Sequence, residues 1–497
     1  MKRLIILLVL MVAMTVTADS HTTVTLVLSS DPQTLDPQGR PHPSHAAILP
    51  YIYDTLVYQD ENGLIQPFLA ESWSASEDGL SVTFVLKPDV VFSNGSPVNA
   101  DAVIYTFQRL QAQGQTSLIY NEISNIAGFE KIDDLTVRFD LTEPSASLLS
   151  ALSYAFAGIL DPEATEAGGE AYGLTPVGSG AFMLADWVQG NSITLVANPN
   201  YSGHRPTGSA NDVAELQIRF TSDEAMRVNA LLSGEVDIAF LSSAPQLDRI
   251  AEDATFTVLE SPSRGMVILG VNTERVPLDV RQIIAQAIDK QIIVDIAVPG
   301  LAVPVDSPIP PSIYGYNGDL VGMAYDPEAA RAALETVEVG TLTILTSTYP
   351  TNQTIATIIQ AQLSEIGIDA EIEVLDFAAS REAASAGDYD LLVTNYNWND
   401  PDLLRLYLST ESISAPNYYF YSNADFDALV QQGRTTYDDA ARYEIYTQAQ
   451  QIVMEELPWI PLYMPITKVV VNNRIANVSL LNTHVVLDSA QIEGNNE

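Results

Sequence analysis

The 497-residue sequence contains no cysteine. A chain without cysteine forms no disulfide, offers no thiolate to a metal ion and carries no lipid on an N-terminal cysteine. Basic residues are scarce as well, because 22 lysines and arginines stand against 63 acids and the formal net charge is −41. Such a surface repels nucleic acid and anionic lipid, so we expect neither as a partner.

The residues and motifs that hydrolases use are also few. The chain holds five histidines, and it contains neither a Gly-x-Ser-x-Gly turn nor a His-Glu-x-x-His helix motif. With 63 acidic residues, a catalytic pair of carboxylates remains an alternative. No spacing in the sequence indicates which two residues would form it. We therefore expect no catalytic residue, no resident metal and no cofactor, and a secreted hydrolase is the rival class.

Long apolar runs are absent after the N-terminus. Lys2 and Arg3 precede an apolar run over residues 4–14 and a stretch of small residues that ends at Ala18. This pattern is typical of a secretory signal peptide and predicts cleavage after Ala18. The run is too short for a permanent membrane span. We expect a soluble periplasmic or extracellular protein that has lost residues 1–18.

The sequence has enough apolar residues, 47%, for two or three domains with real cores. Strand and helix patterns alternate along most of the chain, which predicts an α/β fold class with mostly parallel sheets. We expect strands at residues 24–28, 216–220, 236–240, 266–271, 342–346, 368–374 and 391–395, and helices at residues 223–233, 280–288 and 355–366.

The stretch over residues 69–110 has a distinctive order of turns, strand and helix. A turn leads into a strand whose Val82, Phe84 and Leu86 share one face. An Asn-Gly turn then leads to a helix that begins near Asn99. This order predicts a small strand-turn-helix unit.

That stretch resembles a signature of the extracytoplasmic solute-binding proteins of the peptide, opine and nickel class (family 5), which deliver ligands to ABC importers. Other segments resemble further parts of the family pattern, in the family's order. They are the Leu-Asp-Pro at residues 35–37 and the segments 176–201, 272–290 and 424–464. The resemblance covers nearly the whole chain after residue 18.

The resemblance implies a two-lobed periplasmic-binding-protein-like clamp of the class II type, with a small α+β domain inserted in lobe one. Lobe one is expected at residues 19–55, 175–271 and 462–497, the inserted domain at 56–174 and lobe two at 272–461. It also implies a monomer that closes around a solute and then contacts the permease subunits of an ABC transporter. A binding protein that serves a sensor, and not an importer, remains an alternative.

Ligands of open parallel sheets bind beyond the carboxyl ends of the strands. The loop after the strand at 391–395 is therefore a candidate site, and it carries Tyr396, Asn397, Trp398, Asp400 and Asp402. In peptide-binding relatives a tryptophan here flanks the ligand, and an aspartate a few positions on holds the ligand ammonium. The stretch is shorter here, so either aspartate is the anchor or a structural turn residue.

Further candidates lie on other loops. Relatives use the backbone of the loop at residues 38–45, which contains Arg40 and His42, to pair with an extended peptide. His42 and His45 have a metal-like spacing, but no third ligand is near, which favours a surface loop. Ser242 follows the strand at 236–240. Arg264 either meets a ligand carboxylate in the cleft or pairs with an acid on the surface.

The ligand expected from the resemblance is a di- or oligopeptide. The loop at Trp398 has no arginine nearer before it than Arg381, so a carboxylate clamp of the peptide type is not evident. An oligosaccharide stacked on Trp398 and Tyr396 therefore remains the alternative.

Overall fold

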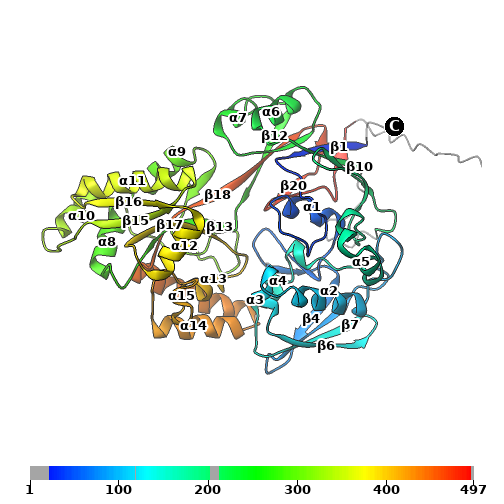
Figure 1. Cartoon of the computed structure of the whole chain (residues 1–497), viewed down its shortest axis with the longest axis horizontal. Coiled ribbons are helices and arrows are strands. Elements are labelled where there is room, and N and C mark those ends of the chain that lie inside the picture. The colour runs from blue at the N-terminus through cyan, green and yellow to red at the C-terminus, as the bar shows by residue number, and fades with distance from the viewer. Residues whose placement is uncertain (1–21, 118, 202–211, 494–497) are drawn as a thin grey trace, which may run out of the picture.

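The computed structural model describes residues 22–117, 119–201 and 212–493. The predicted signal peptide, residues 1–18, lies outside the described residues. The described chain forms two halves that stand side by side in Figure 1. Among the helices within these ranges, none combines the length and the hydropathy that a membrane span requires.

One long strand, β18 (Trp459–Asn472), belongs to both halves. Its first part pairs with β13 (Gly265–Val271) and β14 (Ala302–Pro304). Its last part pairs with β12 (Phe256–Pro262) and β11 (Ile238–Leu241). Because β12 and β13 follow each other in the chain and both lie against β18, these strands cross together from one half to the other (Figure 1).

The first half is built on the parallel strands β1, β10 and β11, to which β9 and β8 add an antiparallel edge. The bounds of its other elements are β1 (Thr23–Leu28), α1 (His45–Ile52), α5 (Pro162–Gly168), β8 (Phe182–Val188), β9 (Ser192–Ala197), β10 (Glu215–Phe220), α6 (Glu224–Leu232), α7 (Ala244–Asp248), β19 (Ile475–Ala476), β20 (Ser479–Leu481), β21 (His484–Val486) and β22 (Gln491–Ile492). The Asp223 side chain accepts the Met226 N–H at the start of α6, and Gly234 has a φ of +76° just after its end. These caps explain why the predicted helix at 223–233 is found.

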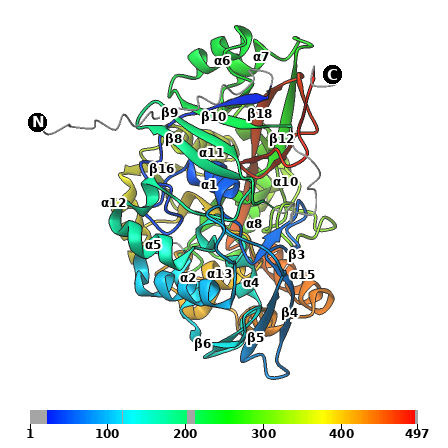
Figure 2. The same cartoon turned by 90° about the vertical axis from the view of Figure 1, so that its right-hand side faces the viewer.

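An α+β unit with its own core lies between α1 and β8 in the sequence. Its four-stranded antiparallel sheet has the order β4-β5-β7-β6 and occupies the lower end of the molecule in Figure 2. The bounds are β2 (Val57–Gln59), β3 (Ile65–Pro67), β4 (Ala70–Ala75), β5 (Ser81–Leu86), α2 (Ala100–Ala112), η1 (Gly114–Thr116), α3 (Tyr120–Ile123), β6 (Ile126–Asp133), β7 (Thr136–Leu141), α4 (Ser147–Ala151), η2 (Ala155–Ala157) and η3 (Gly169–Leu174). Val82, Phe84 and Leu86 are buried on one face of β5, and the Asn99 side chain caps α2, as the sequence predicted.

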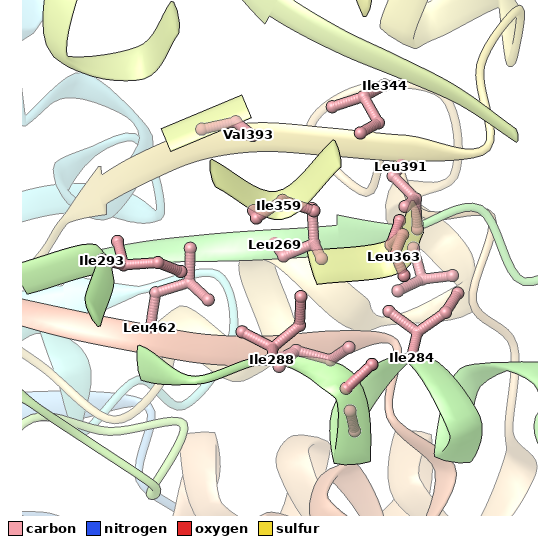
Figure 3. Close-up of a cluster of buried hydrophobic side chains, with 14 of the residues drawn as sticks. Leu269, Ile284, Ile288, Ile293, Ile344, Ile359, Leu363, Leu391, Val393 and Leu462 are labelled. Atoms are coloured by element: carbon pink, nitrogen blue, oxygen red, sulfur yellow. The ribbon is translucent and has the colours of Figure 1, made fainter. Parts of the chain in front are cut away.

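The second half holds a sheet in the order β16-β15-β17-β13, in which β15 is parallel to both neighbours and β13 is antiparallel to β17. The bounds are α8 (Leu278–Ala287), α9 (Lys290–Ala297), α10 (Pro327–Ala333), β15 (Leu342–Ser347), α11 (Pro350–Ile366), β16 (Ala370–Leu375), α12 (Phe377–Ala386), β17 (Leu391–Asn397), α13 (Leu403–Leu408), η4 (Thr410–Ser412), α14 (Ala424–Thr435) and α15 (Asp439–Glu456). Figure 3 shows the core on one face of this sheet, where Ile284 and Ile288 meet Leu269 and Leu363.

Two strand boundaries differ from those expected. The strand predicted at 236–240 begins at Ile238, because the N–H groups of Glu235 and Val236 both donate to Ala230 O at the end of α6. The strand predicted at 391–395 continues through Asn397, because β13 offers backbone partners as far as Gly265. The second difference matters for the candidate site, since it moves two of its residues from a loop into a strand.

Candidate functional site

The pairing of β13 with β17 brings two predicted ligand residues together. Gly265 at the start of β13 lies opposite Asn397 at the end of β17. Directly beyond this pair, the backbone N–H of Trp398 donates to the backbone carbonyl of Arg264 at 3.4 Å. Arg264 and Trp398 are thus neighbours at the end of β17, where the crossing strands enter the second half.

The Arg264 side chain is half-buried and makes no ion pair with any described residue. Burial lowers the pKa of its guanidinium, while the nearby Tyr154 and Asp60 act to raise it. An arginine keeps its charge even when its pKa is lowered, because its ordinary value lies far above neutrality. The end of β17 therefore carries a partly desolvated cation without a fixed anion.

The two aspartates that follow Trp398 have different surroundings. Asp400 is buried, and its carboxylate accepts two hydrogen bonds from Arg442, at 2.6 and 3.0 Å. The Ser150 hydroxyl on α4 donates to the same carboxylate at 2.6 Å. Burial alone would raise the pKa of Asp400, but the charge and hydrogen bonds of Arg442 hold it below its usual value. Asp400 therefore links α15 to α4 of the α+β unit.

Asp402 is also buried and paired inside the chain. The Arg405 guanidinium binds it at 2.8 to 3.1 Å, and the Tyr446 hydroxyl donates to it at 3.1 Å. Burial raises the pKa of Asp402 above its usual value, since it outweighs the charge of Arg405. Each aspartate that the sequence offered as an ammonium anchor thus has an arginine partner of its own.

Asn399 completes the attachment of this loop to the α+β unit. Its side-chain amide donates to Ser150 O at 2.9 Å, and its backbone carbonyl accepts from Gln59 Nε2 at 2.7 Å. Asn399 and Asp400 are both nearly inaccessible to solvent. The loop after Trp398 therefore joins the second half to the α+β unit in this structure.

Tyr396 and Asn397 lie on strand β17 and not in the predicted loop. The Tyr396 ring is buried and stacks on Trp459, with ring centroids 5.0 Å apart, and its hydroxyl donates to Pro308 O at 2.5 Å. Because successive strand residues face opposite sides, Asn397 is exposed where Tyr396 is buried. Tyr396 is therefore a core residue in this arrangement, and the expectation of a loop at residues 396–397 was wrong.

A small pocket lies at the carboxyl end of β15 and beside the middle of β17, near the position that the parallel-sheet rule selects. It measures about 30 Å³ and is lined by Ser347, Tyr349, Asn352, Phe377, Ser380, Arg381, Ala384, Leu392, Val393, Thr394 and Asn395. The Arg381 guanidinium lies 5.0 Å from the centre of the Tyr418 ring and 5.3 Å from that of Phe377. The volume suits roughly one water molecule, so this pocket alone does not hold a solute.

No hydrogen bond or ion pair among the described residues joins the candidates on the early loop to Arg264 or Trp398. Arg40 is exposed and makes no ion pair within the described chain, and His42 Nδ1 accepts the Ser44 N–H at 3.2 Å. His45 opens α1, is buried, and shares a hydrogen bond of 2.8 Å with Thr34 O through Nε2. No cluster of three metal-ligating side chains occurs in the parts of the chain that the structure describes.

Ser242 is exposed at the end of β11. Its N–H and its hydroxyl both donate to the Glu224 carboxylate, at 2.8 and 3.0 Å. Its polar groups therefore serve a turn in the first half.

Comparison with known proteins identifies a family whose members share this sequence pattern and fold. A model of "Bacterial extracellular solute-binding proteins, family 5 Middle" matches residues 65–414. The chain belongs to this family. Sequence thus predicted the family correctly, and the α/β two-lobed fold with it.

Family members of known description match over most of the chain. A di/tripeptide-binding protein of Pseudomonas aeruginosa (strain UCBPP-PA14) is 32% identical over 80% of this chain and 81% of its own length. A probable D,D-dipeptide-binding periplasmic protein of Escherichia coli (strain K12) is 29% identical over 90% and 89%. The structure of a periplasmic binding protein of Helicobacter pylori in complex with the peptide STSA has 26% identity, a TM-score of 0.72, and coverage of 95% of this chain and 98% of its own.

One charged residue near the family's expected ligand loop was not found from sequence. Glu122, on α3 of the α+β unit, has a buried carboxylate oxygen, Oε2, with no hydrogen-bond partner. Burial raises the pKa of Glu122 to about 7, and the charges of Asp402 and Asp400 act in the same direction. Nothing in the sequence separates Glu122 from the other acids, because its isolation depends on residues almost 280 positions away.

Proposed function

We propose that this protein captures a di- or oligopeptide outside the cytoplasm and delivers it to an ABC importer by closing its two halves. Family membership supports the transport role, and the relatives named for dipeptides and tripeptides support the ligand class. The permease subunits of the importer are the membrane partner in this proposal.

The observation that carries the ligand proposal is the guanidinium of Arg264, which has no ion-pair partner among the described residues, on a residue whose backbone carbonyl accepts the backbone N–H of Trp398. Every free peptide has a terminal carboxylate, which an arginine binds with charge-assisted hydrogen bonds. Apolar side chains of the peptide pack against a half-buried tryptophan. Asn397, exposed next to both, offers an amide to the peptide backbone.

Closure follows from where these residues lie. Arg264 precedes a strand that crosses between the halves, so a ligand held there contacts both sides only when they approach. A ligand shifts the equilibrium between open and closed forms by its difference in affinity for them. Binding thereby becomes a signal that the transporter reads.

The proposal includes several further properties. The chain is exported with a signal peptide that is cleaved after Ala18, acts as a soluble monomer and catalyses no reaction. Lobe one comprises residues 19–55, 175–271 and 462–497, the inserted domain 56–174, and lobe two 272–461. Strand β13, at the end of the second lobe-one segment, pairs along its whole length with β17 of lobe two, so we place the crossing between the lobes just before Gly265 and not at residue 271.

A ligand screen tests the function. The purified protein is mixed with each alanyl-X dipeptide, with tripeptides and with maltotriose and cellotriose, and its melting temperature is measured. We expect a peptide at 100 times its Kd to stabilise the protein by about 2.7 kcal/mol, and X-ray scattering to show a smaller radius of gyration.

Other outcomes overturn parts of the proposal. Stabilisation by an oligosaccharide alone would indicate that the ligand is a sugar and not a peptide. Shortened peptides in the mass spectrum after incubation would indicate that the protein is a hydrolase. No stabilisation and no compaction with any peptide overturns the proposed function.

A further inference from the structure

The α+β unit is attached to the first half of the molecule. Its sequence lies between α1 and β8, which both belong to that half. Arg109 of α2 donates two hydrogen bonds to the carboxylate of Asp36, at 2.6 and 3.0 Å. The Ile159 N–H donates to the backbone carbonyl of Asp54 at 2.9 Å. Because these contacts lie on one side of the crossing strands, we expect the α+β unit to move together with the first half.

The same unit also contacts the second half, through two segments of that half. The first segment is the loop at residues 399–400, which hydrogen-bonds to Gln59 and Ser150. The second segment lies at residues 434–437, between α14 and α15.

The segment at 434–437 binds the α+β unit through backbone and side-chain groups. The Ala146 N–H donates to the backbone carbonyl of Arg434 at 2.8 Å, and the Arg434 guanidinium binds Glu143 at 2.6 Å. The Tyr437 hydroxyl accepts the Ser145 N–H at 3.2 Å. The α+β unit is therefore held by hydrogen bonds to a half of the molecule in which its sequence is not inserted.

This contact is polar, and the apolar cores on its two sides remain separate. Within the described chain, Tyr437 is the one residue of the second half that packs on the core of the α+β unit, and the apolar clusters of the second half contain no residue of that unit. Gln59 Oε1 and Arg434 Nε are buried and have no hydrogen-bond partner among the described residues, although both side chains donate across the contact. Separation would give these atoms water as a partner. Relative motion is the ordinary expectation for domains whose contact is polar and not a large apolar surface.

The contact lies away from the strands that connect the two halves. Figure 1 shows β12 and β18 crossing in its upper part, and α13 beside α3 and α4 in its lower part. A rotation of the halves about the crossing strands therefore has to separate the α+β unit from the second half, while the pairings of β18 are kept. Because the contact consists of groups of the chain alone, its free energy favours the closed form with or without a ligand.

We propose that the contact of the α+β unit with residues 399–400 and 434–437 is a latch, which closes the two halves independently of a ligand and opens to admit one. This inference rests on the proposed function, and it gives the inserted domain a part in setting how often the binding protein is closed. The apparent Kd of a ligand that binds only the closed form equals its Kd for that form divided by the closed fraction. The latch therefore strengthens binding without contacting the ligand.

A distance measurement on the unliganded protein tests the latch. The chain has no cysteine, so Asp134→Cys and Glu444→Cys place spin labels at two chosen positions only. Asp134 lies in the turn between β6 and β7 of the α+β unit with its side chain 83% exposed, and Glu444 is exposed on α15. Pulsed electron resonance gives the distribution of distances between the labels. We expect two populations, a shorter distance for the closed latch and a longer one for the open latch.

Two substitutions in the labelled protein weaken the latch. Ser150→Ala removes the hydroxyl that donates to Asp400 and leaves the pair of that carboxylate with Arg442 complete. Tyr437→Phe removes the hydroxyl that accepts the Ser145 N–H. We expect each variant to lower the ratio of closed to open protein about 5-fold, the usual weight of one hydrogen bond, and the double variant about 25-fold. Titration with the alanyl-X dipeptide that gives the largest thermal shift should show an affinity that falls in proportion to the closed fraction.

Ser179→Ala and Tyr51→Phe are the matched controls. The Ser179 hydroxyl donates to the buried carboxylate of Asp54 at 2.9 Å, and the Tyr51 hydroxyl donates to Val485 O at 2.5 Å. Both bonds lie within the first half. These variants should lower the melting temperature, because each loses a buried hydrogen bond, and should leave the ratio of closed to open protein unchanged.

The outcomes separate the latch from the function beneath it. A single distance distribution that is identical in the wild type, Ser150→Ala and Tyr437→Phe overturns the latch, and so does an equal shift in the two control variants. If the closed fraction falls and the affinity does not, the contact has no part in capture and the inference is wrong. If no dipeptide binds the wild type, the proposed function fails, whereas the distances still decide whether the latch exists.

Discussion

Two groups of charges near the contact between the second half and the α+β unit differ in one respect. Asp400 and Asp402 are buried with arginine partners, whereas Glu122 and Arg264 are desolvated without any. A buried charge with a partner is fixed in structure, and removing the partner is strongly destabilising. A desolvated charge without a partner lowers the stability of the fold, and binding an opposite charge removes part of that cost. The difference separates charges that an internal partner fixes from charges that have no such partner among the described residues.

The largest effect on stability is expected when a buried ion pair is broken. Arg442→Met leaves the buried Asp400 without its partner and should lower the free energy of unfolding by about 3–5 kcal/mol, measured by urea denaturation. The double variant Arg442→Met/Asp400→Asn should recover much of the loss. If the single variant is as stable as the wild type, Asp400 does not depend on its arginine.

The next test removes an unpaired charge. The pKa of Glu122 is raised in the folded protein, from 4.5 to about 7. Its cost to stability is therefore absent below pH 4.5, grows as the pH rises and is complete above pH 7. Glu122→Gln should stabilise the unliganded protein at pH 8 by up to about 3 kcal/mol and leave it unchanged at pH 4. Equal melting temperatures of the two proteins at pH 8 would falsify this account of Glu122.

A smaller effect is expected at Trp398. Trp398→Ala removes the half-buried indole of a residue that is joined to Arg264 through the backbone, and we expect the affinity for the best dipeptide to fall about 10-fold. The free energy of unfolding should fall less than for a core tryptophan such as Trp459, which is fully buried. Titration calorimetry and urea denaturation measure the two quantities. Unchanged affinity would place Trp398 outside the ligand site.

The smallest effect is expected where a pair is complete but exposed. Arg434 binds Glu143 at 2.6 Å between α14 and the α+β unit, and the Glu143 side chain is 49% exposed. Glu143→Gln should change the free energy of unfolding by less than about 1 kcal/mol, because solvent screens such pairs. If Glu143→Gln lowered the free energy of unfolding as much as Arg442→Met does, the loss would depend on the ion pair itself and not on its burial.

Sequence predicted what depends on neighbouring residues. The face of Val82, Phe84 and Leu86 on β5 follows from alternation, and the end of α11 at Gly367, whose φ is +99°, follows from the freedom of glycine. These signals act within a few positions. The fold was therefore accessible from the order of such local patterns.

The charged site was less accessible, because it depends on distant pairs. The role of Asp400 is decided by Arg442, which lies 42 positions later, and by Ser150, which lies 250 positions earlier. Glu122 differs from other acids only in lacking such a partner. Arg264 and Trp398 were both candidates from sequence, but only the pairing of β13 with β17 shows that they are neighbours.

The position of β18 near the C-terminus has a consequence for the order of folding. This strand lies centrally in the sheets of both halves, yet it is among the last segments that the ribosome makes. The core of the second half takes in Tyr463, and the core of the first half takes in Ile492. Because these residues pack against segments made about 190 or more positions earlier, we expect both cores to form only when synthesis is almost finished, whereas the α+β unit has all of its core residues much sooner.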